Sequence, residues 1–142
     1  MQFTAAASVF ARPPLVTAEP DNTMREACRI MDEHDIGALV VVRGQHVLGV
    51  VSERDVAHAV SMAADLDEAR VATWMTSPAI TARPSDPILD VAYLMLDAGI
   101  RHVPLVDEYG TVTGMLSLRD IERPLLEQAL TPASPGASGA QS

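Results

Sequence analysis

The sequence predicts an α/β (α+β) fold made of two β-α-β-β-α repeats, and the main observation behind this prediction is an internal repeat. Residues 49–55 return as residues 114–120: each copy has a glycine, two apolar residues, a serine and, three residues after the serine, an aspartate. The two halves also align upstream of these stretches at a constant offset. The aligned pairs are Pro14 and Pro78, Thr17 and Thr81, Pro20 and Pro84, Met31 and Met95, and Ile36 and Ile100. The single gap falls in a turn, at 43–45 against 107–110, where an insertion is tolerated.

Hydrophobic spacing and turn residues place the elements of the first repeat. Met24, Ala27 and Met31 recur at helical spacing, and Asn22 precedes them as the expected helix cap. The expected order is an extended piece at 15–17, a helix from 22, a buried strand at 37–42, a strand at 46–51 and a helix at 53–60.

The second repeat follows the same pattern. Asp86 is the expected cap of its first helix, and Pro87 stands at the first helical position, where the missing N–H costs nothing. Gly99 ends that helix, and Pro124 is expected to kink or end the last one. The expected later elements are strands at 103–106 and 111–116 and a helix from 119.

Three segments lie outside the repeats. Phe10 aligns with Trp74, which suggests that the start of the chain is a lead-in equivalent to the segment before the second repeat. Residues 65–70 are expected to be helical, whereas the end of the chain is too poor in apolar side chains to fold. The predicted division is a lead-in at 1–12, repeats at 13–60 and 75–128, a linker at 61–74 and a disordered tail at 129–142.

Composition narrows the function classes. The net charge is −9, all ten basic residues are arginines, and no basic cluster is present, so binding to nucleic acid is not expected. The absence of lysine excludes a Schiff-base lysine. One cysteine and the absence of a long apolar run favour a cytoplasmic protein without a membrane segment.

No catalytic pattern is present. The four histidines form no metal-ligand spacing with the cysteine or with one another, and neither repeated serine lies in a nucleophile elbow. We therefore expect no enzyme activity and no metal site.

The repeated stretch has a plausible binding chemistry. Ser52 and Ser117 can each cap the helix that follows, and Asp55 and Asp120 then lie beside the serine hydroxyl on the first turn. A hydroxyl and a carboxylate at a helix start can hold a diol such as a ribose, and the free N–H groups can receive an anion. The alternative is that both copies are only capped helix starts.

The two Gly-x-x-Ser-x-x-Asp endings, with Met75-Thr76-Ser77-Pro78 opening the second repeat and the strand 102–106 within it, resemble a tandem pair of CBS domains (cystathionine β-synthase domains), or Bateman module. The resemblance covers about residues 10–126 and implies two repeats packed through their sheets, with adenine nucleotides or adenosyl compounds bound between them. It implies ribose contacts from Asp55 with Ser52 and from Asp120 with Ser117. It implies adenine contacts at Thr17, Ile36, Gly37, Ala38 and Val40 in one half and at Thr81, Ile100, Arg101, His102, Val103 and Pro104 in the other. Phosphate, if present, would meet Arg54, Arg119, Arg101 or His102.

The repeats differ at two points that matter for a ligand. Gly37-Ala38 stands where the second repeat has Arg101-His102, and Glu53 stands where it has Leu118. Because a carboxylate near a phosphate disfavours polyphosphates, at most one good site is expected.

The resulting hypothesis is a stand-alone sensor, a homodimer, that binds AMP, ATP or S-adenosylmethionine as a regulatory ligand and signals to a separate effector protein. The alternative is a ligand-free dimerisation or protein-interaction module.

Overall fold

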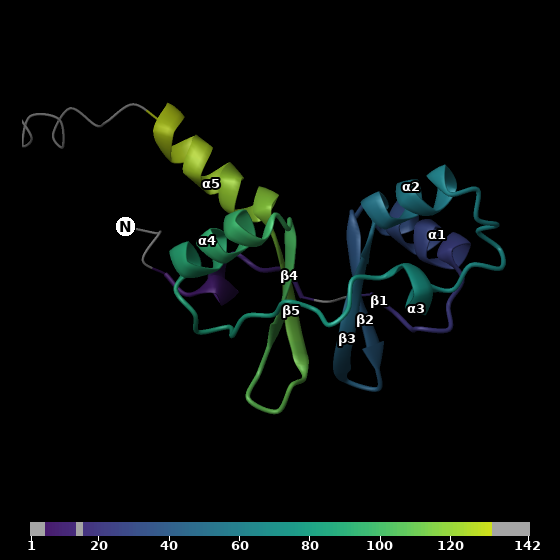
Figure 1. Ribbon diagram of the computed structural model, residues 1–142. Coiled ribbons are helices and arrows are strands. Elements are labelled where there is room, and N and C mark those ends of the chain that lie inside the picture. The colour runs from purple at the N-terminus through teal and green to yellow at the C-terminus, as the bar shows by residue number, and fades with distance from the viewer. Residues whose placement is uncertain (1–4, 14–15, 132–142) are drawn as a thin grey trace, which may run out of the picture.

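A computed structural model describes residues 5–13 and 16–131 and contains two α/β halves (Figure 1). The strands of the halves lie next to each other in the middle of the molecule, and the longer helices lie on the outer sides (Figure 1). A bridge between His46 and Thr111 joins the two hairpins. The predicted fold class is confirmed.

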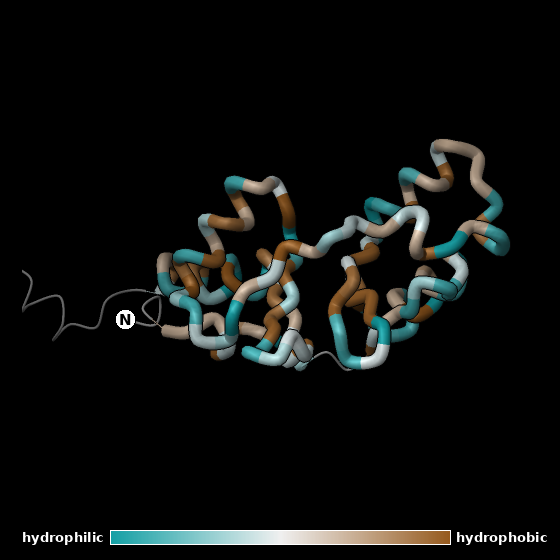
Figure 2. The backbone as a smooth tube through the Cα atoms, turned by 60° about the horizontal axis from the view of Figure 1, so that its bottom comes forward, coloured by the Kyte–Doolittle hydropathy of each residue, from teal (hydrophilic) through white to brown (hydrophobic). Residues whose placement is uncertain are grey.

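The first repeat is a three-stranded sheet with helices on its outer face. Its elements are β1 (Thr17–Ala18), α1 (Met24–His34), β2 (Ala38–Arg43), β3 (His46–Ser52) and α2 (Glu53–Ser61). β1 runs parallel to β2, and β2 runs antiparallel to β3. Leu39 and Val41 of β2 pack in the core with Met24 of α1, and Figure 2 shows apolar stretches along the central strands of both halves. Because side chains alternate along a strand, Ala38 and Val40, which are also buried, lie on the opposite face of the sheet.

The second repeat has the same order with one strand reduced. Its elements are α4 (Ile88–Ala98), β4 (His102–Val106), β5 (Val112–Ser117) and α5 (Leu118–Leu130). β4 and β5 are antiparallel, and the third strand is a single parallel bridge between Ala82 and Leu105. Gly99 ends α4 with a φ of 67°, as predicted.

The two lead-in segments are exchanged between the repeats. The short 3₁₀ turn η2 (Ala7–Val9) packs in the core of the second repeat, whereas α3 (Val71–Trp74) packs in the core of the first. The segments around Phe10 and Trp74 thus pack against one repeat each, the first as a 3₁₀ turn and the second as a short α-helix. Each repeat is completed by a segment that precedes the other repeat in the chain, and the core of the second repeat is whole only with residues from the start of the chain.

Matching hydrogen bonds hold the exchanged segments. The N–H of Ile88 at the start of α4 donates to the carbonyl of Ala5 at 3.0 Å, and the N–H of Met24 at the start of α1 donates to that of Ala69 at 2.8 Å. These bonds satisfy donors that the helix itself leaves unpaired at its first turn.

Two predicted helix caps are wrong by one residue. Thr23, not Asn22, caps α1 in a capping box with Glu26, while the Asn22 side chain accepts a hydrogen bond from the N–H of Glu19. The hydrogen bonds to the Thr23 backbone and side chain lower the pKa of Glu26. In the second repeat Pro87 is the cap residue, because the Asp86 carboxylate accepts from the Arg83 N–H instead.

The linker and the last helix also differ from expectation. Residues 65–70 form turns rather than a helix, since the Asp65 side chain accepts from the N–H of Asp67 and closes a tight turn. α5 continues through Pro124 to Leu130, so the predicted tail from 129 begins too early. The rest of that tail, from 132, lies outside the described residues. In the described part of the chain, no helix is long and apolar enough to cross a membrane.

Candidate functional site

The repeated stretches form two equivalent helix starts, which we call site one (Ser52 and Asp55) and site two (Ser117 and Asp120). In each, the serine side chain accepts from the aspartate N–H, and the aspartate Oδ2 accepts from the serine N–H, at 2.8 Å in site one and 3.0 Å in site two. Both are complete capping boxes. The predicted pairing of hydroxyl and carboxylate is therefore formed in both repeats.

The glycine of each stretch serves the exchanged lead-in rather than a ligand. A Cβ on Gly49 would lie 2.4 Å from the carbonyl oxygen of Thr76, and one on Gly114 would lie 3.1 Å from that of Arg12. Thr76 exchanges two backbone hydrogen bonds with Val50, and Arg12 does the same with Met115. The glycine thus lets the lead-in backbone run close past β3 or β5.

Backbone bonds place the predicted adenine positions beside the capped serines. The N–H of Glu53 donates to the carbonyl of Gly37 at 3.0 Å, and the N–H of Leu118 donates to that of Arg101 at 2.8 Å. Ala38 is paired with Ser52 and His102 with Ser117 in the sheet registers. The structure thus brings both predicted pairs of positions to the helix starts.

The predicted adenine positions do not all lie on one face. Val103 belongs to the core behind β4, on the opposite face from His102 and Pro104, so its side chain does not face the first repeat. Ile36 and Ile100 likewise pack against the two helix-side cores. Thr17, Ala38 and Val40 lie together because Thr17 of β1 is paired with Val40 of β2, and Thr81 is partly buried next to the Ala82 bridge.

His102 lies between the two sites. A Cβ built on Gly37 would be 3.9 Å from its Cε1 atom and 3.4 Å from Oε1 of Glu53. Burial lowers the pKa of His102, Asp120 and Glu53 oppose that shift, and Arg101 and Arg119 add to it. Burial therefore favours the neutral imidazole at a position where charged side chains of both repeats act on it.

Site two contains a pairing that the sequence did not predict. Nε of Arg12 lies 3.2 Å from Oδ1 of Asp120. A cavity of about 230 Å³ opens beside this pair, and Arg119 and Arg123 of α5 also line it. The full lining is Val9, Phe10, Arg12, Arg119, Asp120, Arg123 and Pro124. The sequence did not point to Arg12 because its partner Asp120 lies 108 residues away. Arg12 directly follows the lead-in turn, so it could have been found if the exchange of the lead-ins had been known.

Site one differs at the same positions. The constant offset places Thr76 where site two has Arg12, and His58 where it has Arg123. The His58 ring lies edge-on to Trp74, with 5.4 Å between the ring centroids. Arg54 matches Arg119, so site one keeps one of the three arginines.

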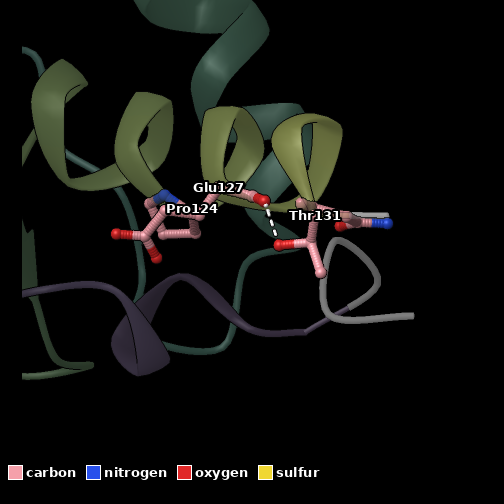
Figure 3. A pocket seen from close by; sticks show the side chains of 4 residues that line it. Pro124, Glu127 and Thr131 are labelled. Atoms are coloured by element: carbon pink, nitrogen blue, oxygen red, sulfur yellow. Dashed lines mark hydrogen bonds between the residues drawn. The ribbon is translucent and has the colours of Figure 1, made fainter. Parts of the chain in front are cut away.

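A further hollow lies on the exposed end of α5, between Pro124, Glu127, Gln128 and Thr131 (Figure 3). The Thr131 hydroxyl donates to the Glu127 carbonyl at 2.6 Å, which caps the end of the helix. None of the site residues predicted from the sequence lines this hollow. Within the described ranges, no group of three or more His, Cys, Asp or Glu side chains is arranged to hold a metal ion.

Comparison with known proteins agrees with this architecture. The family model of the CBS domain matches residues 6–62 and 70–127. An uncharacterised 17.7 kDa protein of Acidianus ambivalens is 34% identical over 121 residues, which are 84% of this chain and 73% of that protein. Two further curated relatives are longer than this chain, which spans 58% of the length of one and 55% of the length of the other.

Solved structures with the same fold contain adenosyl ligands. A CBS domain protein from Pyrobaculum aerophilum, complexed with AMP, has a TM-score of 0.78 and 31% identity, and the match covers 89% of this chain and 99% of that one. A CBS domain pair in complex with 5′-methylthioadenosine and S-adenosyl-L-methionine has a TM-score of 0.81 and 27% identity, with 88% and 98% covered.

Proposed function

This chain belongs to the CBS domain family as a tandem domain pair, and on that premise we propose that it is a regulatory module that binds an adenosine-containing ligand of the AMP, ATP or S-adenosylmethionine class and signals to a separate effector protein. The observation that supports this proposal most is the hydrogen bonding of the Asp55 carboxylate. Its Oδ2 is held by the capping box, and within residues 5–13 and 16–131 no arginine is paired with its carboxylate. A fixed carboxylate with an oxygen to spare is what two ribose hydroxyls require.

Structural relatives support the ligand class. The AMP complex and the complex with 5′-methylthioadenosine and S-adenosyl-L-methionine share a ribose and an adenine, and both relatives have the fold of this chain. The acidic composition and the missing catalytic constellation favour binding and regulation over catalysis. Coupling to an effector requires that the ligand prefer one arrangement of the two repeats. The exchanged lead-ins connect the two repeats.

Isothermal titration tests the proposal. We expect at least one of AMP, ATP and S-adenosylmethionine to bind, and we expect Asp55→Asn and Asp120→Asn each to remove binding at the site that the substitution alters. Asparagine keeps an oxygen for the capping box but loses the charge that holds a diol. Asp97→Asn on the exposed face of α4 is the matched control and should bind as the wild type does. Absence of heat with all three ligands would contradict the proposal.

The alternative, a ligand-free interaction module, is favoured by one surface. Leu89, Tyr93 and Leu96 of α4 are 56%, 74% and 70% exposed and recur at helical spacing. The matching residues of α1 are the polar Arg25, Arg29 and Asp32. A homodimer that buries the α4 face of both copies across a two-fold axis would remove this apolar stripe from water.

Light scattering after size exclusion tests the homodimer. We expect the mass of a dimer for the wild type and of a monomer for Leu89→Arg with Tyr93→Arg, which gives α4 the residues of α1. Arg29→Glu on α1 is the control and should remain dimeric. A monomeric wild type would refute the dimer without bearing on ligand binding.

A further inference from the structure

We propose that Arg12 makes the two sites select different ligands: site two takes a phosphorylated adenosyl ligand, and site one takes an adenosyl ligand without a phosphate. The proposal rests on the function proposed above and assigns a ligand class to each of its sites. Arg12 is the specificity-determining residue, because it competes with a ribose for the carboxylate of Asp120.

Both oxygens of the Asp120 carboxylate have a partner. Oδ1 lies 3.2 Å from Nε of Arg12, and Oδ2 accepts from the N–H of Ser117 at 3.0 Å. The Asp120 side chain is only 10% exposed, whereas that of Arg12 is 67% exposed. A ribose that approached Asp120 would therefore have to displace a guanidinium, and a neutral diol replaces a charged partner poorly.

A phosphate removes this obstacle. Arg12, Arg119 and Arg123 line the 230 Å³ cavity together with one carboxylate, so positive charge is in excess there although the whole chain has a net charge of −9. A guanidinium binds phosphate with two parallel hydrogen bonds. When a phosphate takes Arg12, Oδ1 of Asp120 becomes free for the ribose of the same ligand. Phosphate binding and ribose binding are thereby linked in site two.

The backbone of Arg12 fixes the point from which its side chain acts. Its N–H donates to the Met115 carbonyl at 3.0 Å, and its carbonyl accepts from the Met115 N–H at 2.7 Å. The guanidinium can therefore swing between Asp120 and the cavity without a shift of the lead-in.

Site one has the opposite charge balance. Thr76 replaces Arg12, and its neutral side chain leaves Asp55 open to a ribose. His58, in the place of Arg123, lies against Trp74, and Glu53 adds a carboxylate where site two has Leu118. Among these positions of site one, Arg54 is the one arginine that stands against these two carboxylates, so a phosphate is disfavoured and a neutral or cationic adenosyl group is accepted.

Titration with AMP and adenosine in single-site backgrounds tests the proposal. In Asp55→Asn only binding to site two is measured. There we expect AMP to bind at least about tenfold more tightly than adenosine, because its phosphate adds a charge-assisted hydrogen bond. Adding Arg12→Thr, the residue of site one, should lower that ratio about tenfold by weakening AMP and strengthening adenosine. Arg12→Gln, which keeps the chain length, should act in the same direction, and thermal melts verify that each variant is folded.

The reciprocal variant supplies the matched control. In the Asp120→Asn background site one should prefer adenosine, and Thr76→Arg should turn that preference toward AMP. Equal affinities of AMP and adenosine for site two, with no change of their ratio in Arg12→Thr or Arg12→Gln, would overturn the proposal and leave the proposed function standing. Absence of binding of either ligand to the wild type and to all variants would overturn this proposal, and if ATP and S-adenosylmethionine gave no heat either, it would overturn the proposed function as well.

Discussion

The two repeats of this protein share a backbone and differ in charge. Both have the same capping box, the same strand register beside it and the same exchanged lead-in. At the positions around the aspartate, however, site one has Thr76, His58 and Glu53, and site two has Arg12, Arg123 and Leu118. The two sites therefore share the residues that hold the helix start and differ in the residues that would contact a ligand.

The largest expected effect concerns the glycines that admit the lead-ins. Gly49→Ala should lower the free energy of unfolding by about 2–3 kcal/mol, because its Cβ would stand 2.4 Å from a backbone oxygen that the Thr76 bridge holds in place. Gly114→Ala should cost less, under about 1 kcal/mol, because its contact at 3.1 Å is relieved by a small shift. Urea titration of both variants measures the difference, and equal losses would show that the two lead-ins do not approach as described.

The next effect concerns the caps. Ser52→Ala and Ser117→Ala should each cost about 1 kcal/mol, since each removes the acceptor of one N–H in an equivalent capping box. Thermal unfolding of the two variants measures the costs side by side. A loss in one repeat and none in the other would break the equivalence of the two helix starts.

The smallest expected effect is the pH dependence that His102 of the second repeat supplies below about pH 6.5. His102 has a lowered pKa, so the folded protein prefers the neutral imidazole, and the stabilisation that this provides is present above the ordinary pKa of about 6.5 and is lost as the pH falls toward the folded value. His102→Gln should flatten the decline in stability as the pH falls below about 6.5. Ala38 holds the matching position in the first repeat, so no counterpart is expected there. An unchanged slope would assign the acid sensitivity to other groups.

Much of this architecture could be predicted from the sequence because the signals are local. The spacing of Met24, Ala27 and Met31 and the serine-aspartate pairs lie within single elements, and the repetition doubled each signal. The caps of α1 and α4 were misplaced by one residue, since Asn22 and Asp86 have cap chemistry but their side chains close the preceding turns.

The rest depends on contacts between distant segments. The exchange of lead-ins and the Arg12–Asp120 pair join residues that no spacing rule relates, because the fold alone brings them together. Pro124 was expected to kink or end the last helix, and the helix does not end there, which shows that one lost hydrogen bond does not decide where α5 ends.

Thermal unfolding with and without AMP, compared between Asp55→Asn and Asp120→Asn, tests most directly that the two helix starts are unequal ligand sites. At about one hundred times its dissociation constant, AMP should stabilise a competent site by about 2.7 kcal/mol. We predict that Asp55→Asn keeps the AMP-induced rise in melting temperature and that Asp120→Asn loses it. A rise that survives Asp120→Asn and vanishes in Asp55→Asn would contradict the assignment, and no rise in the wild type would contradict ligand binding itself.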